Sequence, residues 1–165
     1  EMADIWHERN QDPLFDPLPI YYPITVEPKA ENEFYFVNGK CPYFSCNWFR
    51  DNAMLLERYL EGKLGNTLLW INARRAAALG IKDRDWVWVE SEATGLKDKV
   101  RVKVTEGIHP SAVWHVYGYG HKSKLMDKLS RAREGINVND FVPEHYVPWT
   151  AGQAHCEAVV KVYKA

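Results

Sequence analysis

Histidine and tyrosine occur at every second position near the end of the stretch AVWHVYGYGH, residues 112–121. The four residues are His115, Tyr117, Tyr119 and His121. Alternate residues of a strand point to the same side, so we predict that these side chains form one face unless Gly118 and Gly120 interrupt the alternation. Imidazole and phenol groups can move protons, and they can also stack on a flat heteroaromatic ligand or bind its edge. The two glycines would let the backbone approach such a ligand, or would permit a bulge.

Three further polar stretches could contact the same kind of ligand. The first contains Tyr43, Ser45, Cys46 and Asn47, and its short hydroxyl and amide groups suit a phosphate. The second is the Asn-rich stretch around Asn139, which offers hydrogen-bond donors and acceptors together. The third contains His155 and Glu157, just before the last expected strand. The alternative is that these are ordinary turn-forming loops, and that Glu157 pairs with a neighbouring strand.

The chain contains no recognisable catalytic motif. We find no Ser-His-Asp order with a supporting motif, and no GxSxG, HExxH or P-loop sequence. Cys41, Cys46 and Cys156 are odd in number and lack CxxC spacing, which favours free thiols over a disulfide framework or a zinc site. We therefore predict no catalytic residue and no metal ligand in this chain.

Size and charge narrow the class of protein. A chain of 165 residues suits one domain, or one domain with an arm. The net charge of −1 argues against nucleic acid and anionic membrane surfaces as partners. No apolar run approaches the roughly 20 residues of a membrane span, which predicts no direct membrane insertion. The N-terminus has no signal-peptide pattern and does not start with Met, so we expect a fragment or a processed piece.

The pattern along the chain predicts a β-barrel that follows an extended arm. Residues 1–32 hold five prolines, which indicates the arm. Strands are expected at 33–37, 67–71, 85–91, 98–104, 111–117 and 158–163. We expect three short helices. One covers residues 51–61, the second lies between Asn72 as its N-cap and Gly80 as its C-terminal stop, and the third covers residues 123–133. Gly95 marks a hairpin turn. Six strands without a βαβ repeat predict a closed or nearly closed barrel, which leaves no free edges.

Four segments in order resemble one known family. INARRAAALGIKDRDWVWVES resembles the I-N-P-x-D-A-A-x-L-G-I-K-D-G-D-W-V-x-V-x-S segment of the molybdopterin-dinucleotide-binding domain, the C-terminal part of dimethyl sulfoxide reductase family enzymes. VRVKVTEGIHPSAVWHVYGYGH, GINVNDFVPEHYVPWTAG and FYFVNGKCPYFSCNWFRDNAMLLE are similar to three other segments of that domain. The details are nearest to the thiosulfate, polysulfide and arsenate reductase branch.

The resemblance implies a mainly β fold with short helices, a six-stranded double-psi β-barrel at residues 33–165. It implies that the domain holds molybdopterin guanine dinucleotide with Mo or W, shared with other domains or subunits that carry the metal-binding and iron–sulfur parts. The whole enzyme would be an oxidoreductase, and this chain alone would not be catalytically competent. The implied cofactor-binding residues are Tyr43, Ser45, Cys46, Asn47, Tyr117, Tyr119, His121, Asn139, His155 and Glu157.

Departures from the family pattern lead to further expectations. Arg84-Asp85 stands where the family has Gly-Asp, which predicts either a positive φ at a non-glycine residue or a different turn. Val147 replaces the family's acid, which argues against a carboxylate role there. The alternative functions are a stand-alone β-barrel that binds a protein partner or single-stranded nucleic acid, and a small self-sufficient enzyme. The location would be periplasmic or extracytoplasmic for a thiosulfate or polysulfide reductase relative, and cytoplasmic otherwise.

Overall fold

Six strands close into one barrel in the computed structural model, which describes residues 21, 23–41, 54, 67–124, 134–146, 152–153 and 158–165. The strands are β1 (Glu33–Gly39), β2 (Leu69–Asn72), β3 (Trp86–Ser91), β4 (Leu96–Thr105), β5 (Ala112–Val116) and β6 (Val159–Lys164). The described residues also include the short helix α3 (Ala73–Ala78) and the 3-10 helix η4 (Val138–Asp140). Each predicted strand overlaps an observed one, and the predicted closed, mainly β barrel is confirmed.

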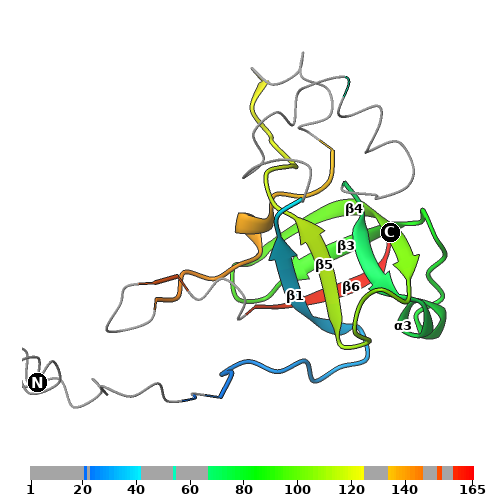
Figure 1. The fold of residues 1–165 in the computed structure, drawn as a ribbon, viewed down its shortest axis with the longest axis horizontal. Coiled ribbons are helices and arrows are strands. Elements are labelled where there is room, and N and C mark those ends of the chain that lie inside the picture. Colours follow the sequence, from blue (N-terminus) through cyan, green and yellow to red (C-terminus); the bar gives the residue numbers. More distant parts are fainter. Residues whose placement is uncertain are drawn as a thin grey trace, which may run out of the picture.

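The strand order around the barrel is β1-β5-β2-β4-β3-β6. Two pairs are parallel, β1 with β5 and β2 with β4, and the remaining pairs are antiparallel. Exchanging β1, β2 and β3 with β4, β5 and β6 leaves this order unchanged, so the barrel has an internal twofold relation, as expected for a double-psi barrel. Figure 1 shows β1 and β5 rising side by side in front of the other strands.

The pairing directions give the barrel two different ends. Strands β1 and β5 run together, and β2 is antiparallel to β5, so β2 and β4 leave at the opposite end. We name the β1/β5 end by residues 39–41 and 116–124, and the β2/β4 end by residues 72–85 and 105–108. In Figure 1 the chain after β5 rises above the barrel, whereas α3 lies at its lower right.

Alternating side chains separate the core from the surface. Along β4 the side chains of Val100 and Val102 are buried, while Lys99 and Arg101, which alternate with them, are exposed. Along β3, Val87 and Val89 point inward with 0% exposure. This period of two is what the sequence predicts for a strand with one buried face. The inner face of the barrel is thus mainly apolar, and the buried polar side chains among the described residues are Asn72, Ser91 and His115.

Turn chemistry at the β2/β4 end also follows the sequence. The side-chain oxygen of Asn72 accepts from the N–H of Arg74 at 3.0 Å, which confirms it as the N-cap of α3. Gly80 follows the helix with φ of +65°. At the opposite end of the barrel, Gly95 turns the β3–β4 hairpin with φ of +69°. Arg84 adopts φ of +68°, so of the two alternatives expected at this turn the positive φ at a non-glycine residue is the one observed.

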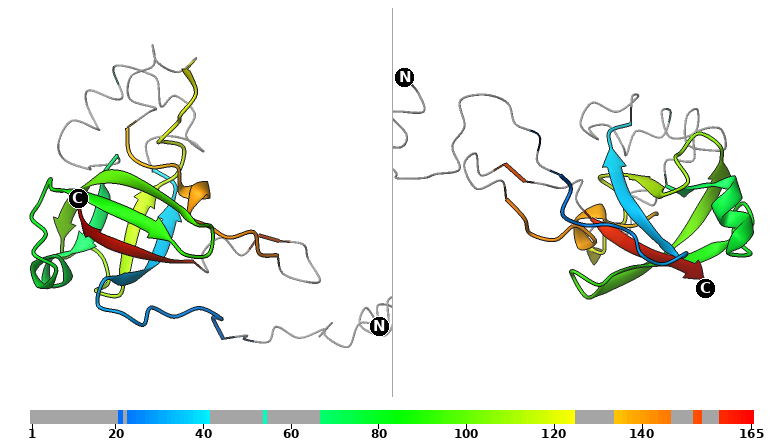
Figure 2. Two further views of the ribbon diagram at one scale, coloured as in Figure 1. Left: turned by 180° about the vertical axis from the view of Figure 1, so that it is seen from behind. Right: turned by 90° about the horizontal axis from the view of Figure 1, so that it is seen from below.

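The arm continues onto the barrel through backbone contacts. The N–H of Val162 donates to the carbonyl of Asn32 at 2.8 Å. The carboxylate of Glu33 accepts from the N–H groups of Lys29 and Ala30, and these bonds lower the pKa of Glu33. Figure 2 shows the start of β1 next to β6 and the arm leading away from the barrel. Segment 23–32 therefore has an extended course that ends in β1.

The two other predicted helices lie mainly outside the described residues. Only Met54 of residues 51–61 is described, and it is helical; of residues 123–133 only Ser123 and Lys124 are described. In the described portion of the chain, no helix has the length and apolar character needed to cross a membrane.

Candidate functional site

Glycines end the alternation that the sequence predicts after β5. The strand stops at Val116, and Gly118 and Gly120 take φ of +89° and +71°. The side chain of His115 is 0% exposed and that of Tyr119 is 1% exposed, whereas Tyr117 and His121 are half-buried. The two glycines therefore interrupt the alternation, and the four side chains do not form the single face that an unbroken strand would give.

Gly120 contacts the protein's own backbone. A Cβ at this position would lie 2.2 Å from the N atom of Asn137 and 2.2 Å from the carbonyl carbon of Ile136. The N–H of Gly120 donates to the carbonyl of Glu134 at 2.8 Å. This close approach to the protein's own backbone is a requirement for glycine that the sequence did not predict. Gly120 lets the chain after β5 lie directly on residues 134–137.

The buried His115 side chain also contacts both the end of β5 and segment 134–137. Its Nδ1 lies 2.7 Å from the carbonyl oxygen of Val116, so Nδ1 carries the proton and donates. Its Nε2 then accepts from the N–H of Ile136 at 3.5 Å. Burial lowers the pKa of His115 to about 4, and the carbonyls of Val116 and Thr67 offset only part of that effect. The ring is thus neutral at ordinary pH.

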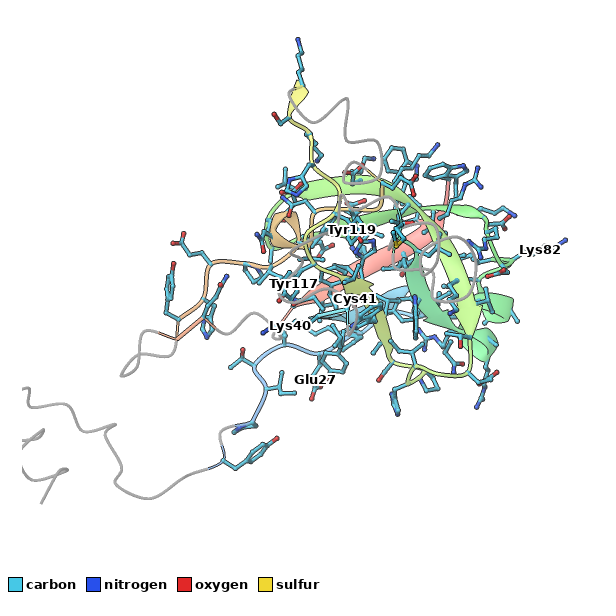
Figure 3. All side chains as sticks on the ribbon, turned by 45° about the horizontal axis from the view of Figure 1, so that its top comes forward. Glu27, Lys40, Cys41, Lys82, Tyr117 and Tyr119 are labelled. Atoms are coloured by element: carbon cyan, nitrogen blue, oxygen red, sulfur yellow. The ribbon has the colours of Figure 1, made fainter. Side chains whose placement is uncertain are left out.

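The end of β1 completes this end of the barrel. The N–H of Tyr117 donates to the carbonyl of Gly39 at 3.2 Å. The Cys41 side chain is buried and packs with Val116 and Tyr119. Figure 3 shows Lys40, Cys41, Tyr117 and Tyr119 grouped together, away from Lys82 at the other end. Tyr119 therefore supports the loop from within rather than lining an open surface.

The outer side of this end carries polar groups. The Nε2 atom of His121 is buried and has no hydrogen-bond partner among the residues that the structure describes. Lys122 lies 3.0 Å from the carboxylate of Asp140 and 3.2 Å from that of Asp98, and the bond to Asp140 is the main cause of its raised pKa. The hydroxyl of Thr94 donates to the carbonyl of Asp140 at 2.7 Å. The β3–β4 hairpin is thereby joined to η4.

The Asn-rich segment has one structural and one exposed amide. Asn137 accepts from the N–H of Asn139 at 3.3 Å and donates to the carboxylate of Asp140 at 2.8 Å. Asn137 is thus the N-cap of η4, in agreement with the turn-forming alternative. Asn139 lies on the same short helix, and its side chain is exposed. Of the two amides, it is therefore the one that a ligand could reach.

Several predicted site residues cannot be placed. Tyr43, Ser45, Cys46, Asn47, His155 and Glu157 lie outside the described residues. Sequence reasoning missed Lys122 and Gly135. The charge of Lys122 is a signal in the sequence, whereas the φ of +76° at Gly135 is known only from the structure. In the ranges that are described, no group of three His, Cys, Asp or Glu side chains could hold a metal ion.

The groups that are described at the β1/β5 end suit the parts of a pterin dinucleotide. The buried Nε2 of His121 is available to bind the edge of a heteroaromatic ring. The phenol of Tyr117 and the amide of Asn139 offer further contacts to a ring edge. Lys124, three residues after His121, is an exposed cation, which suits an anionic diphosphate. The charge of Lys122 is offset by Asp98 and Asp140.

Comparison with known proteins agrees with this geometry. Residues 34–159 match the family described as Molydopterin dinucleotide binding domain. The chain is 29% identical over 131 residues to the thiosulfate reductase molybdopterin-containing subunit PhsA of Salmonella typhimurium, covering 79% of this chain and 16% of the relative. It is 27% identical over 171 residues to a sulfite dehydrogenase subunit of Allochromatium vinosum, covering 92% of this chain and 17% of the relative.

A solved structure shares the fold. Acetylene hydratase from Pelobacter acetylenicus superposes with a TM-score of 0.61 at 15% identity, covering 99% of this chain and 23% of that one. The chain spans about one-sixth of the length of the two curated relatives. The matched residues include β2 to β5 and the loops of the β1/β5 end. The chain belongs to the molybdopterin dinucleotide-binding domain family.

Proposed function

We propose that this domain holds part of a molybdopterin dinucleotide at its β1/β5 end, as the C-terminal domain of a larger oxidoreductase. The observation that carries the proposal is the buried Nε2 of His121, which has no partner in the described part of the chain. It lies at the end where residues 39–41, 117–124 and 134–140 meet. A buried polar atom without a partner is costly in a folded protein, and a ligand atom that bonds to it removes this cost.

Each group has a separate part in the proposed complex. His121 and Tyr117 bind the edge or face of the cofactor ring system, and Asn139 binds a polar edge from η4. Lys122 bonds to Asp98 and Asp140 and so holds the chain after β5 against β4 and η4, while the exposed Lys124 supplies positive charge for the diphosphate. The buried residues beneath this surface, among them Tyr119, support it. When bound, the cofactor supplies the metal chemistry, and the protein supplies position and electrostatics.

The finer assignment rests on the relatives. We propose a guanine dinucleotide form with molybdenum or tungsten, in an enzyme that acts on a sulfur compound. The names of the two curated relatives, thiosulfate reductase and sulfite dehydrogenase, support this substrate class. The small share of those relatives that the chain covers supports a partnership with further domains that hold the metal.

The test compares the two ends of the barrel in the full catalytic subunit. His121→Ala removes the buried nitrogen, and Lys82→Ala removes an exposed side chain at the opposite end. We expect His121→Ala to lower the pterin content several-fold, as measured by fluorescence of the oxidised pterin after denaturation. We expect Lys82→Ala to keep the wild-type content. Chromatography of the released nucleotide identifies the base, and mass spectrometry of the metal distinguishes molybdenum from tungsten.

Two results would argue against the proposal. If the purified wild-type subunit contained no pterin, the proposed function would be refuted. Equal pterin content in wild type, His121→Ala and a His121→Ala/Asn139→Ala double variant would remove the β1/β5 end as the binding surface. Because neither His121 nor Asn139 belongs to the apolar barrel core, a change in folding is not the expected cause of any loss.

The outer face of the barrel supports a second candidate function, binding of an anionic partner. Lys97 and Lys99 lie over the ring of Trp88 at 4.9 and 5.2 Å, and Arg101 lies over Trp86 at 5.1 Å. Trp86 is 47% exposed. Exposed indole rings next to cations could stack on bases or contact an acidic protein surface.

Salt dependence tests this second function. We would titrate the protein with a short oligothymidylate at two salt concentrations and repeat the titration with Arg101→Gln. Binding that weakens steeply with salt and with the substitution would support it. Absence of binding at low salt would remove nucleic acid as the partner.

A further inference from the structure

His115 contacts three separate segments of the β1/β5 end. Its Nδ1 binds the Val116 carbonyl at the end of β5, and its Nε2 faces the Ile136 N–H at 3.5 Å. The carbonyl of Thr67, which precedes β2, also interacts with the ring. These three segments are far apart in the sequence. The ring therefore fixes a spacing that no local interaction along the chain would set.

The fit around this ring is close. A Cβ on Gly135 would lie 2.6 Å from Nε2 and 2.8 Å from Cε1 of His115, and 3.2 Å from the Thr67 carbonyl oxygen. Only a glycine leaves room for the imidazole here, and its φ of +76° is one that glycine adopts without strain. Gly120 also approaches this segment closely, at residues 136 and 137. Segment 134–137 thus contacts both the ring and the chain after β5.

The burial of a polar ring calls for an explanation beyond packing. An apolar side chain would fill the barrel without leaving two nitrogens to satisfy, and the buried ring must stay neutral. Both nitrogens have partners, and these partners lie in the backbone next to the loop that carries His121. A buried polar residue of this kind specifies one arrangement of the chains that it joins.

We infer that His115 is a positioning residue for the cofactor surface: it sets the spacing between the end of β5, Thr67 and segment 134–137, and so the placement of His121 and Asn139. The inference rests on the proposed function, because it gives this spacing a ligand. His115 itself does not touch the cofactor, since its side chain is fully buried. Its role is to hold the backbone from which the contacting side chains extend.

The experiment uses the full catalytic subunit, with and without cofactor, and three variants. His115→Met fills much of the space but makes neither hydrogen bond. His115→Gln can place an oxygen near Nε2 and accept from the N–H of Ile136. Val113→Ala is the control, because Val113 is buried on the same side of β5 and has an apolar side chain.

Two measurements separate positioning from general stability. The first is hydrogen exchange of segment 134–141 in subunit produced without cofactor, where we expect His115→Met to speed exchange about tenfold. The second is the pterin content of subunit produced with cofactor, where we expect a several-fold loss. His115→Gln should restore a large part of both. Val113→Ala should lower the melting temperature while it leaves the exchange of segment 134–141 and the pterin content near wild type.

Other outcomes would overturn the inference. Val113→Ala and His115→Met with equal effects at matched stability would reduce His115 to a core residue. If His115→Met sped hydrogen exchange of segment 134–141 but left the pterin content unchanged, the inferred role of His115 in placing the cofactor surface would be refuted. Absence of pterin from every protein, wild type included, would instead refute the proposed function, while the exchange result would still report on the role of His115 in holding segment 134–141.

A double variant tests the coupling directly. Gly135→Ala should lower pterin content in the wild-type background because its Cβ collides with the imidazole. In a His115→Ala background that collision is absent, so the additional loss should be clearly smaller. Losses that simply multiply would show that the two residues act independently, and this would contradict the inference.

Discussion

The two ends of the barrel are related by its internal symmetry, yet they treat their polar groups differently. At the β2/β4 end, Asn72 is fully occupied: it accepts from Arg74, and its amide donates to the carbonyl of Ile108 at 3.0 Å and to Glu106 at 3.2 Å. At the β1/β5 end, the Nε2 of His121 is buried without a partner in the described part of the structure. The protein itself satisfies the polar side chain that ends β2, and among the described residues it leaves the imidazole nitrogen after β5 unsatisfied, although the Nε of Arg75 in α3 is a second buried atom without a described partner.

This difference shows where function can be placed on a symmetric frame. Each end is formed by one parallel pair of strands, β1 with β5 or β2 with β4, and the two pairs are equivalent in the strand order. The strand arrangement alone therefore does not determine which end carries a site. The selection comes from the segment after each strand. A capped helix continues from β2, whereas β5 leads into two glycines with positive φ and into polar side chains. Variants at the two ends can test this contrast.

The largest effect is expected from alanine at glycines of the two ends. Gly120→Ala should lower the free energy of unfolding by about 4 kcal/mol, because its Cβ collides with the backbone of residues 136 and 137. Gly80→Ala should cost only about 1 kcal/mol, since Gly80 has a similar φ but nothing within 4 Å. Urea unfolding measures both. Equal costs would show that the close approach at the β1/β5 end is not rigid.

The second effect is a pH dependence of the free energy of unfolding, caused by His115 at the β1/β5 end. The pKa of His115 is about 4 in the folded chain, against an ordinary 6.5. The unfolded chain therefore takes up this proton first as the pH falls. Stability should decrease from pH 6.5 towards pH 4, by up to about 3 kcal/mol. Urea unfolding at a series of pH values, with His115→Gln as the control, checks this.

Carboxylates with lowered pKa values act in a lower pH range. Hydrogen bonds from backbone N–H groups lower the pKa of Glu33 below 4.5 and that of Asp85 below 3.8. Their contribution is present above those ordinary values and is lost as the pH falls through the lowered ones. The range from pH 6.5 to 4.5 is therefore free of both carboxylates. A slope in that range that persists in His115→Gln would contradict the assignment to His115.

The third effect concerns the occupied polar group of the β2/β4 end. Asn72→Ala removes the N-cap and both amide hydrogen bonds, and should cost about 2 kcal/mol. Asn72→Ser keeps a capping oxygen and should cost about half as much. Urea unfolding gives the stability, and pterin content of the full subunit should not change. A loss of pterin in a stable Asn72→Ser variant would show that the two ends do not act separately.

The smallest effect comes from the strained turn before β3. Arg84 holds φ of +68°, where a side chain is unfavourable. Arg84→Gly should raise the free energy of unfolding by about 0.5 kcal/mol, because the relief of strain exceeds the added chain entropy of glycine. Thermal unfolding measures this gain. Destabilisation would indicate that contacts of the arginine side chain outweigh the strain.

The sequence predicts the parts of this fold that depend on local chemistry. Alternating residues place β3 and β4, and Asn72 caps α3. The Gly-to-Arg departure leaves two alternatives for the turn, of which the positive φ of Arg84 is the one observed. The site was less predictable, because its geometry depends on contacts between distant segments. Nothing near Gly120 in the sequence indicates that it lies on residues 136 and 137. For the same reason His115, expected on a ligand face, is buried in the barrel.

The strand order has a consequence for how this domain folds. Every ladder of the described barrel joins one of β1, β2 and β3 to one of β4, β5 and β6. A nascent chain that ends before β4 therefore has no pair of these strands to form. We expect the halves, divided in the turn between Ser91 and Leu96, to be unstructured alone and to assemble when mixed. Synthesis must pass the middle of the domain before the barrel sheet can begin to form.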